Sequence, residues 1–160
     1  MKIRLLVILI PLLGLIFGYI LRKIAPDEAE QGKKYFFRGR QLILFMLMLT
    51  LLWITPITFP MSIAFVVGII SAKLLRLRYL YLGIAAVATF TASHEQALLI
   101  AALLFLYGLP FGTQMIKKDP RPALAKHAVL YLLPFILLTT PFSSSPLLSA
   151  FTAGTLFLRE

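Results

Sequence analysis

Residues 41–72 read QLILFMLMLTLLWITPITFPMSIAFVVGIISA, a stretch that contains no Asp, Glu, Lys, Arg or His. A transmembrane helix needs about 20 predominantly apolar residues. The segment ITPITFP at Ile54–Pro60 divides the stretch into two apolar runs, because its two prolines interrupt helical hydrogen bonding. The stretch therefore predicts two membrane-spanning helices joined by a short uncharged turn.

The same pattern extends over the whole chain of 160 residues, of which 60% are hydrophobic and 14% are charged. This composition lies outside the usual range of soluble domains. The seven apolar runs are Leu5–Leu21, Gln41–Thr55, Thr58–Ala72, Tyr79–Ala92, Ala97–Ile116, Ala128–Thr140 and Leu147–Leu158. Shorter runs can gain length where flanking basic side chains extend to the interface. We therefore expect an all-α, polytopic transmembrane helical bundle of about seven spans.

The chain is expected to form a single integral membrane domain, 1–160. Residues 1–21 are the first span, residues 22–40 a cytoplasmic interfacial segment, and residues 41–158 three transmembrane hairpins. Arg22 and Lys23 follow the first run, and no small-residue cleavage site follows it, so a permanent span is expected instead of a removable signal. No Asp, Glu, Lys or Arg is expected in the middle of a span.

Charge divides the breaks between the runs into two kinds. Fourteen of the sixteen Lys and Arg residues lie at Arg22–Arg40, Lys73–Arg78, Lys117–Lys126 and the C-terminus. The breaks at Thr55–Pro60, Ser93–Gln96 and Pro141–Pro146 contain none of them. Basic loops face the cytoplasm in membrane proteins. We therefore expect a multi-pass protein of the cell membrane with its N-terminus outside and its C-terminus in the cytoplasm.

Two of the predicted hairpins share a pattern of residues. Pro60, Ala64, Phe65, Gly68 and Lys73 have the same relative spacing as Pro146, Ala150, Phe151, Gly154 and Arg159. The middle hairpin keeps only Phe105 and Gly108 of this pattern. A repeated hairpin is one interpretation, and a chance match between apolar sequences is the other.

The outer turns carry candidate binding residues, first of all His94, Glu95 and Gln96. Ionisable side chains near membrane depth are costly unless they have a role, and His changes charge near physiological pH. The alternative is that Ser93 and Gln96 form a capping box at the start of the next helix, with His94 and Glu95 facing water.

Ser143, Ser144 and Ser145 lie between two prolines in the last outer turn. Their hydroxyls could bind a polar ligand, but small turn residues would produce the same pattern. No basic partner accompanies them in the sequence, so nucleophilic catalysis of the triad type has no support.

Basic residues on the cytoplasmic side are candidates for contacts with lipid head groups or with a partner subunit. They are Lys33, Lys34, Lys117, Lys118 and Arg121. Their spacing does not match a phosphate-binding loop. The net charge of +10 is scattered between apolar runs and forms no basic face, so nucleic-acid binding is not expected.

Catalytic chemistry has little basis in this sequence. The chain contains no cysteine, which excludes thiolate nucleophiles and cysteine-ligated metals. We expect no enzyme, no cofactor and no metal site, and His94 with Glu95 is the pair on which an intramembrane enzyme would depend.

The leading functional hypothesis is a small membrane protein that binds a small solute, or helps to translocate it, through an outward-facing pocket between the hairpin turns. In helix number and size the hairpin core is similar to the substrate-capturing membrane subunit of vitamin importers, although no motif is shared. The alternative is a non-catalytic subunit of a larger membrane complex. Small-residue faces such as Gly14 with Gly18, and Gly108 with Gly112, would suit such a subunit.

Overall fold

The computed structural model describes residues 2–75, 78–88, 92–113, 121–139 and 145–157, and this part of the chain is helical without any strand. The elements are α1 (Lys2–Ile24), α2 (Pro26–Gln31), α3 (Lys33–Ile54), α4 (Phe59–Leu75), α5 (Arg78–Ala88), α6 (His94–Thr113), α7 (Arg121–Leu132), the 3-10 helix η1 (Leu133–Thr139) and α8 (Pro146–Phe157). The predicted all-α class is confirmed.

Two of the described helices, α3 and α6, are both long enough and apolar enough to cross a membrane. Shorter apolar helices cover Phe59–Leu75, Tyr79–Ala88, Ala125–Ile136 and Pro146–Phe157. By length and composition, the described residues therefore contain two candidate spans.

Each predicted apolar run overlaps a helix among the described residues, and two differences affect the site described below. α3 begins at Lys33, so the segment predicted as interfacial, residues 22–40, contains the end of α1, all of α2 and the first turns of α3. The other difference is at Pro134, where α7 is followed by η1. A proline has no amide hydrogen and its ring collides with the preceding turn, which favours the change to a 3-10 helix here, although α1 and α6 continue through Pro11 and Pro110.

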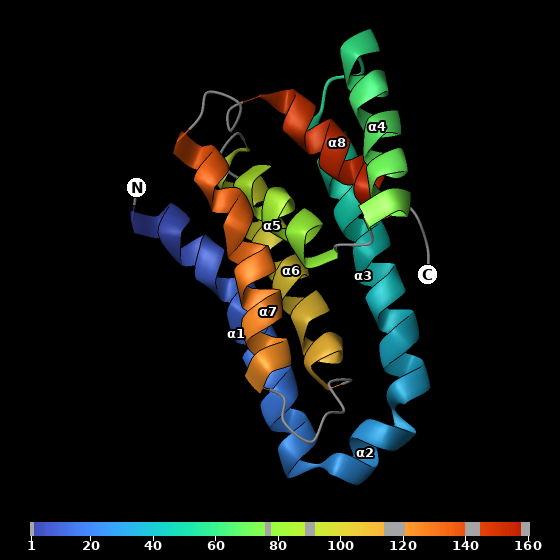
Figure 1. The fold of residues 1–160 in the computed structure, drawn as a ribbon, viewed down its shortest axis with the longest axis vertical. Helices are drawn as coiled ribbons and strands as arrows, with labels where there is room; N and C mark the ends of the chain where they lie inside the picture. Colours follow the sequence, from blue (N-terminus) through green and yellow to red (C-terminus); the bar gives the residue numbers. More distant parts are fainter. Residues whose placement is uncertain (1, 76–77, 89–91, 114–120, 140–144, 158–160) are drawn as a thin grey trace.

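The helices alternate in direction along the chain. In Figure 1, α1, α4, α6 and α8 run downward when followed along the colour bar, whereas α3, α5 and α7 run upward. The short helix α2 lies at the lower end of the molecule, which is also where α6 ends and α7 begins. This end carries the basic segment 22–40, and it is called the basic end below.

The most extensive packing joins α1 to α6, which are parallel and far apart in sequence. A Cβ at Gly14 would overlap the carbonyl oxygen of Phe105, and one at Gly18 would overlap that of Leu109. Gly112 of α6 lies in the same way against Leu15 of α1. The two small-residue faces therefore pack against each other within the chain.

The next most extensive contact joins α4 to α8. Gly68 lies against the carbonyl oxygen of Phe151, and Gly154 lies against that of Phe65. These four residues belong to the pattern shared by the first and last predicted hairpins. The two copies of the pattern thus pack on each other, while α3 and α4, the arms of the first predicted hairpin, are not an extensively packed pair.

The remaining helices complete the core. α5 packs on α7 and η1, with Gly83 against the carbonyl oxygen of Tyr131. α3 packs on both α6 and α8, and its Leu47 and Leu51 are fully buried. The core is therefore assembled from helix pairs that are not neighbours in the sequence.

Candidate functional site

The outer-turn candidates before α6 form a helix cap. The Ser93 backbone amide donates to Oε1 of Gln96 at 2.9 Å, and the Gln96 amide donates to Oγ of Ser93 at 3.4 Å. This is the reciprocal geometry of a capping box, so that interpretation is confirmed. His94 and Glu95 are exposed.

Ser145 also caps the N-terminus of a helix. Its hydroxyl accepts a hydrogen bond from the Leu147 amide at 3.3 Å, and its carbonyl oxygen accepts one from the Leu148 amide at 3.0 Å. Ser145 therefore occupies an N-terminal capping position of α8. Ser143 and Ser144 lie outside the described residues.

The basic candidates are dispersed along the basic end. Lys33 and Lys34 are exposed in the first turn of α3, and Arg121 is the first residue of α7. Lys117 and Lys118 lie outside the described residues. Of these five residues, the structure therefore describes only the side chains of Lys33 and Lys34, and both are exposed.

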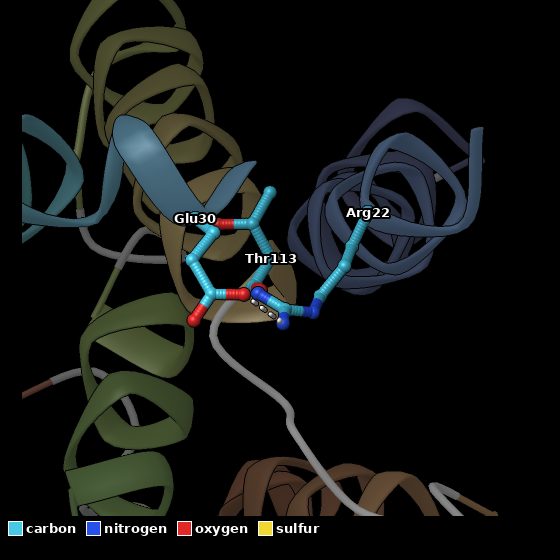
Figure 2. Close-up of polar contacts among 3 residues, drawn as sticks. All are labelled: Arg22, Glu30 and Thr113. Atoms are coloured by element: carbon cyan, nitrogen blue, oxygen red, sulfur yellow. Dashed lines mark hydrogen bonds and ion pairs between the residues drawn. The ribbon is translucent and has the colours of Figure 1, made fainter. Parts of the chain in front are cut away.

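A different basic residue, Arg22, joins three helices at the basic end (Figure 2). Its Nη1 donates to the carbonyl oxygen of Thr113 at 3.0 Å, and its Nη2 lies 3.9 Å from Oε2 of Glu30. A cation at the carboxyl end of a helix is favourable, because the last carbonyl groups there lack intrahelical donors. Arg22 therefore holds the end of α1 beside the end of α6.

The main unexpected feature is Arg40, which is only 6% exposed. It is the eighth residue of α3, about 10 Å along the helix from Lys33. Its guanidinium carbon lies 5.2 Å from the centre of the Phe37 ring and 5.9 Å from that of Phe111. Both distances are typical of cation–π contacts. Arg40 directly precedes the apolar run predicted to span the membrane, and the packing of α3 buries it inside the protein.

Aromatic rings from three helices pack together beside Arg40. Tyr79 of α5 lies 4.8 Å from the ring centre of Phe111 in α6 and 4.5 Å from that of His127 in α7. Phe111 and His127 are 5.2 Å apart. Arg40, Tyr79 and His127 therefore all lie against the Phe111 ring, although they come from different helices.

A small cavity of about 10 Å³ is lined partly by Tyr79 and the neighbouring Tyr107. Its lining comprises Pro11, Leu12, Leu15, Tyr79, Leu82, Leu104, Tyr107, Gly108 and Tyr131. The volume is close to the minimum that holds one water molecule. The Tyr79 side chain is buried, and its hydroxyl has no hydrogen-bond partner among the described residues. We call Arg40, Tyr79, Tyr107, His127 and Tyr131 the Arg–Tyr cluster.

None of these five residues was among the candidates from the sequence. One signal was present, namely aromatic side chains spaced four apart in the sequence, as in Tyr107 with Phe111 and His127 with Tyr131. Residues four apart lie on one face of a helix. That spacing indicates a shared face, but it does not say which faces meet.

In the part of the chain that the structure describes, no three His, Asp or Glu side chains lie close enough together to hold a metal ion. The cluster combines a buried positive charge on Arg40, aromatic faces, and a buried Tyr79 hydroxyl that has no hydrogen-bond partner among the described residues. No protein-family model, curated protein or solved structure matches this chain.

Proposed function

We propose that this chain is a multi-pass protein of the cell membrane that binds a small solute inside its helical bundle and helps to translocate it. The proposed bundle has seven spans, formed by α1, α3, α4, α5, α6, α7 with η1, and α8. Two of these helices meet the length and hydropathy expected of a span. The alternation of helix directions in Figure 1 supports the other five crossings.

The proposed orientation places the basic end in the cytoplasm. Lys23, Lys33, Lys34 and Arg38 are exposed there, where they would contact anionic lipid head groups or a partner subunit. Ser93 and Ser145 cap helices that start at the opposite end of the bundle. The N-terminus would then be outside and the C-terminus inside.

The burial of Arg40 is the observation that carries the functional proposal. A charged residue inside a membrane-spanning helix is expensive, faces the interior of the bundle, and typically marks a pathway for a substrate or an ion. Arg40 fits this description, since it is buried in a candidate span and lies against the Phe37 ring of its own helix and the Phe111 ring of α6. The Arg–Tyr cluster is therefore our proposed solute site.

The outer turns would form the outer end of the route by which the solute crosses the membrane. Alternating access requires that a central site opens to each side in turn. The expected outward-facing pocket, with His94, Glu95, Gln96 and Ser143–Ser145 at its rim, would provide access from outside. The Arg–Tyr cluster would provide the binding groups nearer the cytoplasm.

The alternative of a non-catalytic subunit in a larger membrane complex predicts small-residue faces that remain uncovered on the isolated chain. Gly14, Gly18 and Gly112 instead contact backbone within the chain. These faces are therefore not available to a partner helix, which favours the solute-binding proposal.

The test is ligand-dependent thermal stability of the purified protein in mild detergent against neutral, anionic and cationic metabolites. A ligand present at 100 times its Kd stabilises a protein by about 2.7 kcal/mol. We expect one chemical class to stabilise the parent protein and Arg38→Gln, and to have no effect on Arg40→Gln. Arg38 is the matched control because it is exposed on the same helix. A flat profile for all classes would overturn the proposal and favour the complex-subunit alternative.

A further inference from the structure

One face of α3 is exposed along most of the helix, and along this face the side chains change from basic to apolar. Lys34 and Arg38 are exposed in the first turns. Leu42, Phe45 and Leu49 follow, with exposed fractions of 60%, 51% and 44%. At 3.6 residues per turn, these five positions lie within about 80° of one another around the helix axis. They form one continuous surface, which we call the α3 stripe.

The opposite side of α3 packs into the bundle. Arg40, Leu47 and Leu51 are buried on that side, and α3 packs on α6 and α8. This packing determines which side of α3 faces away from the bundle. The first turns of α3 lie beside α2 at the basic end (Figure 1). The charged part of the α3 stripe therefore lies at the basic end, and the apolar part extends from it toward the opposite end.

The length of the apolar part fits half of a bilayer. Arg38 and Leu49 are eleven residues apart, which corresponds to about 16 Å along an α-helix. The hydrocarbon core of a bilayer is about 30 Å thick, so one leaflet contributes about 15 Å. An acyl chain lying beside Leu42, Phe45 and Leu49 would therefore have its head group level with Lys34 and Arg38.

The charged part of the α3 stripe suits an anionic head group. Lys34 and Arg38 are about 6 Å apart along the helix axis, so the phosphate of one lipid can contact both side chains. Glu30, on the preceding helix, is paired with Arg22. Each basic residue near an anionic membrane surface raises affinity by roughly five-fold. A zwitterionic head group carries its own positive charge, which weakens this attraction.

The apolar side chains of the α3 stripe favour lipid over a partner helix. Interfaces between membrane helices are enriched in small residues, which let two backbones approach closely. Gly14 and Gly68 make such approaches within the chain itself. Leu42, Phe45 and Leu49 are large, and an acyl chain can adapt to their irregular surface.

We infer that the α3 stripe binds an anionic phospholipid, with its phosphate on Lys34 and Arg38 and an acyl chain along Leu42, Phe45 and Leu49. This inference rests on the membrane location in the proposed function, and it names the lipid partner of the exposed basic residues. The α3 stripe lies on the outer side of the bundle, so binding there requires no opening of the Arg–Tyr cluster.

Native mass spectrometry of the purified full chain would measure the binding of dioleoyl phosphatidylglycerol and dioleoyl phosphatidylcholine. The two lipids share their acyl chains and differ in head-group charge. At equal concentrations, we expect the first bound lipid to be phosphatidylglycerol at least five-fold more often. The double variant Lys34→Gln with Arg38→Gln should lose this preference.

Lys73→Gln with Lys126→Gln is the matched control. It removes two exposed charges from α4 and α7 and leaves the same net charge as the first double variant. The control should retain the preference for phosphatidylglycerol. An equal loss in both double variants would assign the preference to the total charge of the protein and overturn the α3 stripe as the binding site.

Phe45→Ala tests the apolar part, and it keeps the inference testable if Lys34→Gln with Arg38→Gln fails to fold. It shortens an exposed side chain without changing charge, so we expect both lipids to bind several-fold more weakly with an unchanged ratio. Glycerol 3-phosphate, which has a phosphate but no acyl chain, should not displace bound phosphatidylglycerol. Unchanged affinity for both lipids, or displacement by glycerol 3-phosphate, would overturn the proposed acyl contact.

The outcomes separate this inference from the proposed function. Equal binding of the two lipids by the parent chain would overturn the inference and leave the membrane location intact. Failure of the chain to associate with liposomes of either lipid would overturn both. A protein that copurifies with the parent chain and is lost from Lys34→Gln with Arg38→Gln, without any preference for phosphatidylglycerol, would make the α3 stripe a protein interface and overturn the inference.

Discussion

Gly68 of α4 packs so closely on Phe151 of α8 that a Cβ at Gly68 would overlap the Phe151 carbonyl oxygen. Gly68→Ala should therefore force α4 and α8 apart. Overpacking of this kind costs about 1–3 kcal/mol, and we expect the unfolding free energy in detergent to fall by an amount in this range. Thermal unfolding followed by circular dichroism would measure the change.

Gly39→Ala is the matched control, because a Cβ at Gly39 would meet nothing within 4 Å. The substitution adds the helix preference of alanine without a collision, so stability should rise by up to about 1 kcal/mol. Equal effects at the two positions would show that the α4–α8 contact does not limit stability.

The sequence indicated these glycines but not their partners. Phe65 with Gly68 and Phe151 with Gly154 stood out through identical spacing, and the structure shows each glycine against the other copy's phenylalanine carbonyl. Spacing along one helix defines a face, because residues three and four apart are neighbours there. The partner of that helix face is set by packing across the whole bundle, and a local sequence pattern does not encode this packing.

Two residues of the site, Arg40 and His127, were harder to predict because they lie at the margins of apolar runs. Arg40 directly precedes the run that begins at Gln41, so hydropathy alone placed it in a loop, whereas α3 begins at Lys33. His127 likewise directly precedes the run that begins at Ala128. The helices extend beyond the runs, and packing against neighbouring helices then buries Arg40 and leaves His127 half-buried.

Ser93 and Gln96 support a prediction about the start of α6. Ser93→Ala removes the hydroxyl that accepts from the Gln96 amide, and loss of such a cap costs about 1 kcal/mol. Thermal unfolding should show this loss, with a smaller one for Gln96→Ala.

The double change His94→Gln with Glu95→Gln should leave stability unchanged, since both side chains are exposed. If that double variant lost solute binding, His94 or Glu95 would contact the solute directly, in addition to any role of the turn in capping α6.

Arg22 should contribute much more to the stability of the protein than its ion-pair partner, Glu30. The Arg22 side chain is 19% exposed and donates to the Thr113 carbonyl, while the Glu30 side chain is 73% exposed and its oxygen is 3.9 Å away. Hydrogen bonds from charged groups contribute about 1.5–3 kcal/mol, whereas exposed ion pairs contribute about 0–1 kcal/mol. Arg22→Gln should therefore lower the melting temperature clearly and Glu30→Gln barely. A larger effect of Glu30→Gln would contradict the geometry in Figure 2.

Trp53 offers a direct test of membrane contact. It is the only tryptophan, it is 75% exposed, and it lies one residue before the end of α3. Tryptophan side chains concentrate at the membrane–water interface. In liposomes, lipids brominated near the head group should quench its fluorescence strongly and aqueous iodide only weakly. Strong iodide quenching without any effect of brominated lipids would place Trp53 in water and oppose the proposed bundle.

The number of spans can be decided with single cysteines in the cysteine-free chain. Lys34, Lys73 and His94 are exposed positions in α3, α4 and α6. If all seven proposed helices cross, α3 and α4 bring Lys73 back to the side of Lys34, and α5 then carries the chain to the opposite side at His94. A membrane-impermeant maleimide should therefore label His94→Cys in intact cells, and Lys34→Cys and Lys73→Cys only after permeabilisation.

Lys73→Cys is the decisive variant, because the two-span alternative gives a different result. If α3 and α6 alone crossed, Lys73 would lie on the side of His94, and both cysteines would react in intact cells. The unsubstituted chain, which should stay unlabelled, controls for background. The short helix α4 carries apolar, exposed side chains such as Val66 and Ile70 along its length. These side chains favour lipid over water as the surroundings of α4, and so we expect Lys73→Cys to be protected.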